Sequence, residues 1–103
     1  MARVDGRIEF DAAKIPEICR RHNIARLALF GSVIHKDFRP ESDVDALVEF
    51  EQGNTPGLEF FEIQAELSAA CGRMVDLNTK QDLSPYFRDE VLGEAVVIYD
   101  KKE

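Results

Sequence analysis

Two aspartates separated by a single residue are the clearest chemical feature of the sequence. Asp43 and Asp45 stand in the segment 43–50, where residues alternate as they do on a half-buried β-strand. Residues two apart on a strand project from the same face, so both carboxylates are expected within a few ångström of each other. Like charges that close repel unless a proton or a cation lies between them. Because Mg²⁺ prefers one or two carboxylates together with water and substrate phosphates, the pair predicts a magnesium site.

A third carboxylate is expected to complete this site. Asp76 lies among apolar residues in the segment 74–79, which predicts another short strand. An aspartate in such surroundings is costly to bury unless something pairs with it. We therefore predict that Asp76 holds one ion and withdraws the proton from an attacking hydroxyl. The residues alone leave Asp82 and Glu49 open as alternatives for this position.

Gly31 and Ser32 supply the complementary half of the predicted site. A glycine at the end of a strand lets the backbone approach a ligand closely. The serine that follows begins a turn whose N–H groups and hydroxyl can hold phosphate oxygens. We therefore predict that Gly31 and Ser32 bind the polyphosphate of a nucleotide. Carboxylates on one side and phosphate donors on the other are typical of two-metal attack at phosphorus, with pyrophosphate as the leaving group.

Helical and strand segments must position these residues. Capping residues and apolar residues at helical spacing predict the helices, and short apolar or alternating runs predict the strands. The expected helices are 11–22, 58–71 and 84 to about 92, and the expected strands are 24–30, 43–50, 74–79 and an edge strand at 95–99.

This order of elements predicts an α/β fold of the α+β kind, a short mixed sheet with helices packed on it. The connection 31–42 is too polar and too interrupted to be the crossover helix of a parallel pair. The strands 24–30 and 43–50 should therefore run antiparallel. The end of the first strand then lies beside the start of the second, and the glycine–serine pair meets the two aspartates at one edge of the sheet.

Length and charge limit what the chain can do alone. Its 103 residues suffice for one domain, expected to span residues 1–103, so a large acceptor would have to come from another chain. A net charge of −7 disfavours direct binding of nucleic acid through phosphate neutralisation. The sequence shows no signal peptide and no membrane-length apolar run, and Cys19 and Cys71 lack the spacing of a metal or disulfide site. A cytoplasmic protein with two buried thiols is predicted.

The motifs together match a known family. The string FGSVIHKDFRPESDVDALVEF holds Gly31 and Ser32, ten intervening residues, and then Asp43 and Asp45. This arrangement resembles the signature of the DNA polymerase β-like nucleotidyltransferase superfamily, and it is most similar to the minimal members of the MNT or MntA type, over nearly the whole chain. The resemblance implies a polymerase β-like core, Mg²⁺ as cofactor and a nucleoside triphosphate as substrate. By position it assigns phosphate binding to Ser32 and metal binding to Asp43, Asp45 and Asp76.

The same resemblance implies a partner. Minimal nucleotidyltransferases are similar to the antitoxin half of HEPN/MNT pairs, in which the MNT protein transfers AMP from ATP onto a tyrosine of a HEPN ribonuclease toxin. We therefore expect a protein adenylyltransferase with ATP and a HEPN-type toxin as partners. Two alternatives stay open: a catalytically silent module that neutralises its partner by contact, and nucleotidyl transfer to a small molecule. The sequence also leaves base preference and assembly into homo-oligomers open.

We expect structural roles for the two histidines and for the glutamates of the helix 58–71. His22 and His35 stand apart from each other and from the cysteines, so roles at a helix end or on the surface are expected. The acidic residues of the helix 58–71 are expected to be solvated: Glu59, Glu62 and Glu66.

Overall fold

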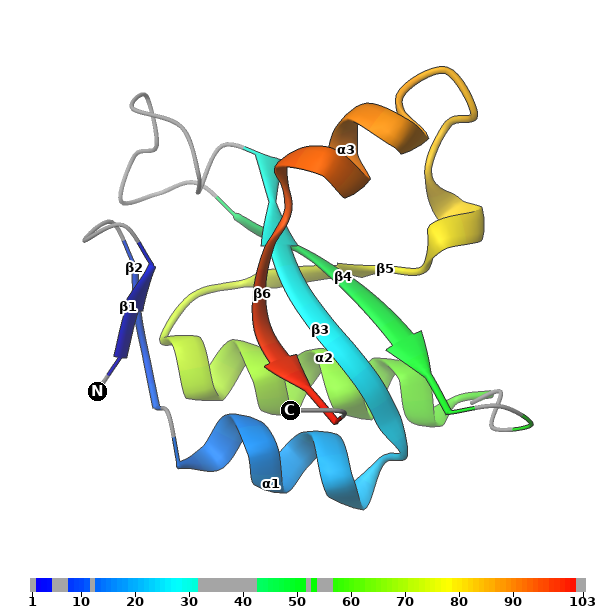
Figure 1. The fold of residues 1–103 in the computed structure, drawn as a ribbon. Coiled ribbons are helices and arrows are strands. Elements are labelled where there is room, and N and C mark those ends of the chain that lie inside the picture. Colours follow the sequence, from blue (N-terminus) through cyan, green and yellow to red (C-terminus); the bar gives the residue numbers. More distant parts are fainter. Residues whose placement is uncertain are drawn as a thin grey trace.

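The computed structural model describes residues 2–4, 8–11, 13–31, 43–51, 53 and 57–101. Figure 1 shows how its elements are arranged. They follow one another along the chain as β1 (Ala2–Val4), β2 (Ile8–Phe10), α1 (Lys14–Arg21), β3 (Ile24–Phe30), β4 (Val44–Phe50), α2 (Glu59–Cys71), β5 (Val75–Asn78), the 3-10 helix η2 (Lys80–Asp82), α3 (Arg88–Glu94) and β6 (Val96–Asp100).

The central sheet is mixed and has the strand order β5-β4-β3-β6. β3 runs antiparallel to both of its neighbours, β4 and β6, whereas β4 runs parallel to β5. The predicted antiparallel pairing of 24–30 with 43–50 is confirmed, as is the edge strand at the C-terminal end. A separate antiparallel pair, β1 with β2, stands beside this sheet (Figure 1).

Helices α1 and α2 pack side by side against one face of the sheet (Figure 1). Successive strand residues point to opposite faces. Every second residue of β3, β4 and β5 therefore points into the core between the sheet and helices α1 and α2. The buried core is built from Ile15, Ile18, Cys19, Leu27, Leu29, Val44, Ala46, Val48, Ile63, Leu67, Val75, Leu77 and their neighbours. The alternate strand residues, Asp45 and Asp76 among them, therefore face away from these two helices.

Local capping explains where the first two helices begin and end. The Asp11 carboxylate accepts hydrogen bonds from the N–H groups of Ala13 at 3.0 Å and Lys14 at 3.3 Å. α1 then starts at Lys14, which keeps Pro16 inside the first turn, where a proline is tolerated. Helix α2 ends at Cys71 and is capped by Gly72, whose φ of 67° gives the left-handed cap that glycine adopts without strain. Both helices match the sequence prediction.

The last helix begins later than predicted. The helix was expected to begin at residue 84, but the chain turns there: the Phe87 N–H donates to the Ser84 carbonyl at 3.0 Å, and α3 starts only at Arg88. Pro85 follows Ser84. Because proline suits the second position of a turn as well as the first turn of a helix, the Ser84-Pro85 pair does not distinguish a turn from a helix start. Tyr86 is 93% exposed, so no buried apolar stripe holds this segment in a helix.

Two short elements go beyond the sequence prediction, the β1–β2 pair and η2. The Asp5-Gly6 dipeptide lies between the paired strands in the sequence and is a standard hairpin signal. η2 carries a capping box, in which the Asp82 carboxylate accepts a hydrogen bond from the Thr79 N–H at 2.9 Å and the Thr79 side chain accepts one from the Asp82 N–H. Both signals are short and depend on local hydrogen bonds rather than on periodicity.

Cys19 and Cys71 are buried and form no disulfide. Burial raises the pKa of the Cys19 thiol to about 12 and that of Cys71 to about 11, so both are inert apolar residues, as predicted. Within the described ranges, no helix has both the length and the apolar character needed to cross a membrane.

Candidate functional site

Asp43, Asp45 and Asp76, called here the aspartate cluster, come together at one end of the sheet. Asp43 lies directly before β4, Asp45 lies within β4, and Asp76 is the register partner of Asp45 on the parallel strand β5. Register partners project from the same face, as do residues two apart on one strand. All three side chains therefore leave the sheet on the face away from α1 and α2. Asp45 is partly buried, whereas Asp43 and Asp76 are exposed.

The electrostatics of the cluster are unfavourable in the protein alone. Burial, followed by the negative charges of Asp76 and Asp43, raises the pKa of the Asp45 carboxyl above its ordinary value. The ion pairs between described residues join other groups and include none of these three aspartates. Like charges thus face one another without a basic side chain of the described chain between them.

The cluster is not a closed metal cage. Among the residues that the structure describes, no group of three acidic, histidine or cysteine side chains is arranged to hold a metal ion by itself. Any cation here would take part of its ligands from water or from substrate. That is the coordination that Mg²⁺ favours, because it keeps several waters and binds through one or two carboxylates plus phosphates.

Gly31 lies against the cluster, and a side chain at this position would force the Asp45 carboxylate to move. The last residue of β3, Phe30, is the register partner of Asp45, so Gly31 follows directly beside it. Gly31 has a φ of +75°, and a Cβ atom there would lie 2.3 Å from Oδ2 of Asp45. The predicted meeting of the glycine with the aspartates is thus present. Ser32, the predicted phosphate ligand, lies outside the described residues.

The two alternative carboxylates are occupied elsewhere. Asp82 caps η2 through its bonds to Thr79. Glu49 lies at the other end of β4, where its carboxylate is 3.7 Å from the guanidinium of Arg26. Of the three candidates for the third position, only Asp76 is in register with Asp45.

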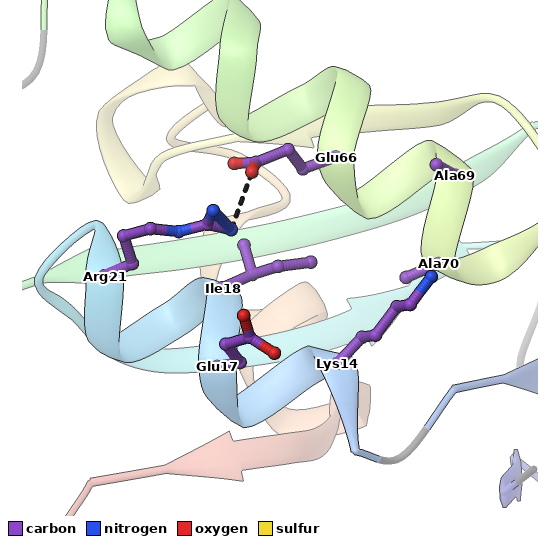
Figure 2. Close-up of a pocket in the computed structure, with 7 residues that line it drawn as sticks. All are labelled: Lys14, Glu17, Ile18, Arg21, Glu66, Ala69 and Ala70. Atoms are coloured by element: carbon purple, nitrogen blue, oxygen red, sulfur yellow. Dashed lines mark hydrogen bonds and ion pairs between the residues drawn. The ribbon is translucent and has the colours of Figure 1, made fainter.

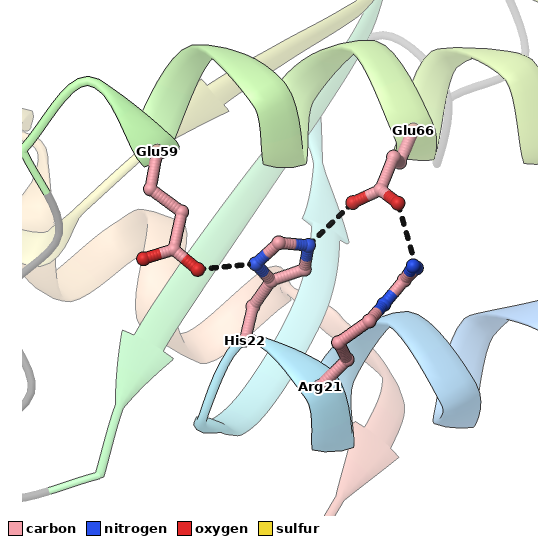
Figure 3. A network of polar contacts seen from close by, with 4 residues as sticks. All are labelled: Arg21, His22, Glu59 and Glu66. Carbon is pink, nitrogen blue, oxygen red and sulfur yellow. Dashed lines mark hydrogen bonds and ion pairs between the residues drawn. The ribbon is translucent and has the colours of Figure 1, made fainter.

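A second cluster of carboxylates lies between α1 and α2, and the sequence does not predict it. We call it the His22 clamp: Arg21, His22, Glu59 and Glu66 (Figure 3). The His22 ring contacts Glu59 through Nδ1 at 2.5 Å and Glu66 through Nε2, and Arg21 pairs with Glu66 at 2.6 Å. Glu59 is exposed, as expected, although it also contacts His22, whereas Glu66 is only partly exposed. The seven-residue spacing of these glutamates, two helical turns, is the sequence signal that places them on one face.

Opposing influences act on the pKa of His22. Burial favours the neutral ring, but hydrogen bonds with Glu59 and Glu66 and the charges of both carboxylates outweigh burial, and the pKa of His22 is raised. The side chain is only 9% exposed. Its role at the end of α1 agrees with the predicted helix-end position, and the contacts to α2 make it a link between the two helices.

A groove of about 240 Å³ runs along the same helix pair (Figure 2). It is lined by Lys14, Glu17, Ile18, Arg21, Glu66, Ala69 and Ala70. Acidic and basic side chains are balanced in it, and Arg21 and Glu66 already bond each other. Because none of its lining residues belongs to the aspartate cluster, the groove is a seam between helices and does not extend the candidate site.

Comparison with known proteins agrees with this geometry. Residues 13–103 match the family described as polymerase beta, nucleotidyltransferase. The protein adenylyltransferase MntA of Thermococcus cleftensis is 35% identical over 83 residues, which cover 80% of this chain and 82% of that protein.

Solved structures give the same result. A candidate minimal nucleotidyltransferase, 35% identical, superposes with a TM-score of 0.68 over 82% of this chain and 86% of its own. A Shewanella oneidensis complex of an MNT antitoxin with a tri-AMPylated HEPN toxin shares the fold, with a TM-score of 0.60 at 19% identity over 88% of this chain and 71% of that chain. These matches confirm the predicted polymerase β-like fold.

Proposed function

The chain belongs to the polymerase β nucleotidyltransferase family, and on that premise we propose that it transfers AMP from ATP to a tyrosine hydroxyl of a partner protein. The observation that carries the proposal is the register of Asp45 with Asp76 beside Gly31. It puts carboxylates that can bind a cation next to the glycine that ends β3. The aspartates and Gly31 are the proposed site residues, together with Ser32.

A divalent cation fits the residues present. Burial and the neighbouring charges of Asp76 and Asp43 raise the pKa of the Asp45 carboxyl, and a cation would relieve this repulsion. Carboxylate oxygens are the hard ligands that Mg²⁺ prefers. Asp43, Asp45 and Asp76 would hold the ion together with water and substrate phosphates, because no three described side chains are arranged to hold it by themselves. When bound, Mg²⁺ supplies charge neutralisation at the phosphates and favours deprotonation of the attacking hydroxyl.

The remaining steps fall to the side chains and backbone of this chain. Because Gly31 has no side chain, the Asp45 carboxylate can lie against its backbone, with Oδ2 only 2.3 Å from where a Cβ would be. Asp76 is exposed and faces away from the core, so its carboxylate can accept the proton of an acceptor hydroxyl as the oxygen attacks the α-phosphorus. The bond to pyrophosphate breaks as the new phosphodiester bond forms.

The proposed acceptor is a HEPN-type toxin, which makes the chain an antitoxin. Support comes from the name of the MntA relative and from the Shewanella oneidensis complex, in which the HEPN toxin carries AMP. A cytoplasmic location, the absence of nucleic-acid binding and the question of homo-oligomers stay predictions from the sequence.

Mass spectrometry of the partner tests this function. The chain is incubated with the HEPN-type protein, ATP and Mg²⁺, and the partner is weighed intact and then mapped by peptide. We expect added AMP on a tyrosine, lost when Asp45→Asn is used and retained with Glu49→Gln, a matched change at the other end of β4. An unmodified partner after incubation with wild-type protein would contradict the proposal. Neutralisation by Asp45→Asn without added AMP would favour the binding module instead.

A further inference from the structure

The strand that carries Asp76 is held along its outer edge by two side chains of α2. β5 is an edge strand of the sheet, with β4 on one side only. The Val75 N–H donates to the Ser68 hydroxyl oxygen at 2.9 Å, and the Leu77 N–H donates to the Gln64 side-chain oxygen at 3.0 Å. These two N–H groups flank Asp76 and point away from β4, because alternate N–H groups of a strand face opposite edges.

Gln64 and Ser68 act as one unit on the helix. They are four residues apart and so lie on the same face of α2. The Ser68 hydroxyl donates to the Gln64 carbonyl oxygen at 2.8 Å while its oxygen accepts from Val75, so both functions of the hydroxyl are used. The Gln64 amide is oriented by its partner, since a backbone N–H can be met only by the amide oxygen.

We propose that Gln64 and Ser68 are positioning residues that fix the place of the Asp76 carboxylate relative to Asp45, an inference that rests on the proposed function. The β4–β5 register alone leaves the outer N–H groups of β5 open to water and to slippage at the edge. Hydrogen bonds on both sides of Asp76 hold its backbone. The buried side chains of Val75 and Leu77 also anchor the strand in the hydrophobic core. Together they limit how far the carboxylate can move from its register partner.

Two measurements test this without relying on transfer. Binding of Mn²⁺ as a probe for Mg²⁺ is followed by electron paramagnetic resonance, and amide hydrogen exchange of Val75 and Leu77 is followed by NMR. In Gln64→Met and Ser68→Ala, both amides should exchange faster, and Mn²⁺ affinity should fall about tenfold, as is typical when outer groups that orient a ligand are lost. Ser68→Thr keeps the hydroxyl and should restore affinity to near the wild-type value.

Glu66→Gln is the matched control on the same helix. It loosens α2 on the side of the His22 clamp and leaves the contacts to β5 intact. It should leave Mn²⁺ affinity unchanged even where thermal stability falls. With the partner protein, the same positioning variants should lower kcat about tenfold, with a smaller change in the KM for ATP.

The outcomes separate this inference from the proposed function. Faster exchange at Val75 and Leu77 with Mn²⁺ affinity within about twofold of wild type would overturn the positioning role and leave Gln64 and Ser68 as edge caps. Weaker Mn²⁺ binding in the variants, with no AMP transfer by wild type, would support the positioning of Asp76 and overturn the transferase proposal alone. Ser68→Ala is the milder change and keeps the test informative if Gln64→Met does not fold.

Discussion

The aspartate cluster and the His22 clamp both contain carboxylates that lie close together, but the charges next to these carboxylates differ. In the clamp, Glu59 and Glu66 bind His22, and Glu66 also binds Arg21 (Figure 3). In the aspartate cluster, the described ion pairs provide no cation, and Asp45 is repelled by Asp76 and Asp43.

This difference separates a structural charge network from a functional one. Charges that are paired inside the fold stabilise it, whereas charges left to repel one another cost stability and are kept where a ligand supplies the missing countercharge. The clamp should therefore be important for folding and dispensable for transfer. The aspartate cluster should behave in the opposite way.

Removal of the Asp45 charge should produce the largest effect. Asp45→Asn keeps the shape of the side chain, and we expect it to lower AMP transfer about a thousandfold or more because a group that stabilises the transferring phosphate is lost. The same change removes a partly buried charge that faces two like charges, so the protein should become more stable by roughly 1 kcal/mol. Transfer assays and thermal unfolding of one preparation measure both. An active variant, or one that is inactive because it has unfolded, would contradict the prediction.

Gly31→Ala should have the next largest effect. The added Cβ would lie 2.3 Å from Oδ2 of Asp45, so that carboxylate must move, and we expect transfer to fall about a hundredfold. Gly72→Ala is the control, because Gly72 has a similar φ of +67° but open space around a Cβ. Both variants should lose stability by about 1 kcal/mol or more from the left-handed backbone. Equal transfer by the two variants would show that the contact with Asp45 is unimportant.

A variant that weakens the clamp should lower stability and leave transfer unchanged. Glu66→Gln removes the charge that holds His22 and Arg21, and we expect a loss of about 1 kcal/mol in the free energy of unfolding. Transfer at temperatures well below the melting point should be unchanged. Denaturant titration and the transfer assay provide the two values. A transfer defect as large as the one expected for Gly31→Ala would remove the distinction between the two clusters.

The smallest expected effect is a change in thermal stability with pH, caused by the titration of His22 in the clamp. His22 has a raised pKa in the folded protein, so the charged ring contributes stability that is fully present below its unfolded pKa near 6.5. This contribution is lost as the pH rises from about 6.5 through the higher folded value. Melting temperatures across this range should fall in wild type and fall less in His22→Gln. Identical slopes would show that Glu59 and Glu66 do not hold a charged His22.

Much of the fold could be predicted because its signals are local. The strands 24–30 and 43–50 alternate or form short apolar runs, and their antiparallel pairing follows from the polar connection between them. The start of α3 could not be predicted, because Ser84 and Pro85 suit a turn as well as a helix and nothing buries the side chains that follow. Burial is decided by tertiary contacts that local spacing does not reveal.

The site divides in the same way. The spacing of Asp43 and Asp45 and the glycine at the end of a strand were visible in the sequence. The pairing of Asp45 with Asp76 was not, because it depends on the parallel register of β4 and β5, and the sequence left Asp82 and Glu49 open as alternatives. The clamp was missed because its partners are 37 to 45 residues apart in the chain. The bonds that hold β5 were missed because they depend on how α2 lies against the sheet edge.

A crystal structure with Mg²⁺ and a non-hydrolysable ATP analogue tests the central claim most directly. We predict a cation bound by Asp45 and Asp76, with phosphate oxygens beside the backbone at Gly31, and no cation at the His22 clamp. Aspartate side chains that point apart around a bound nucleotide, with no cation between them, would contradict the account.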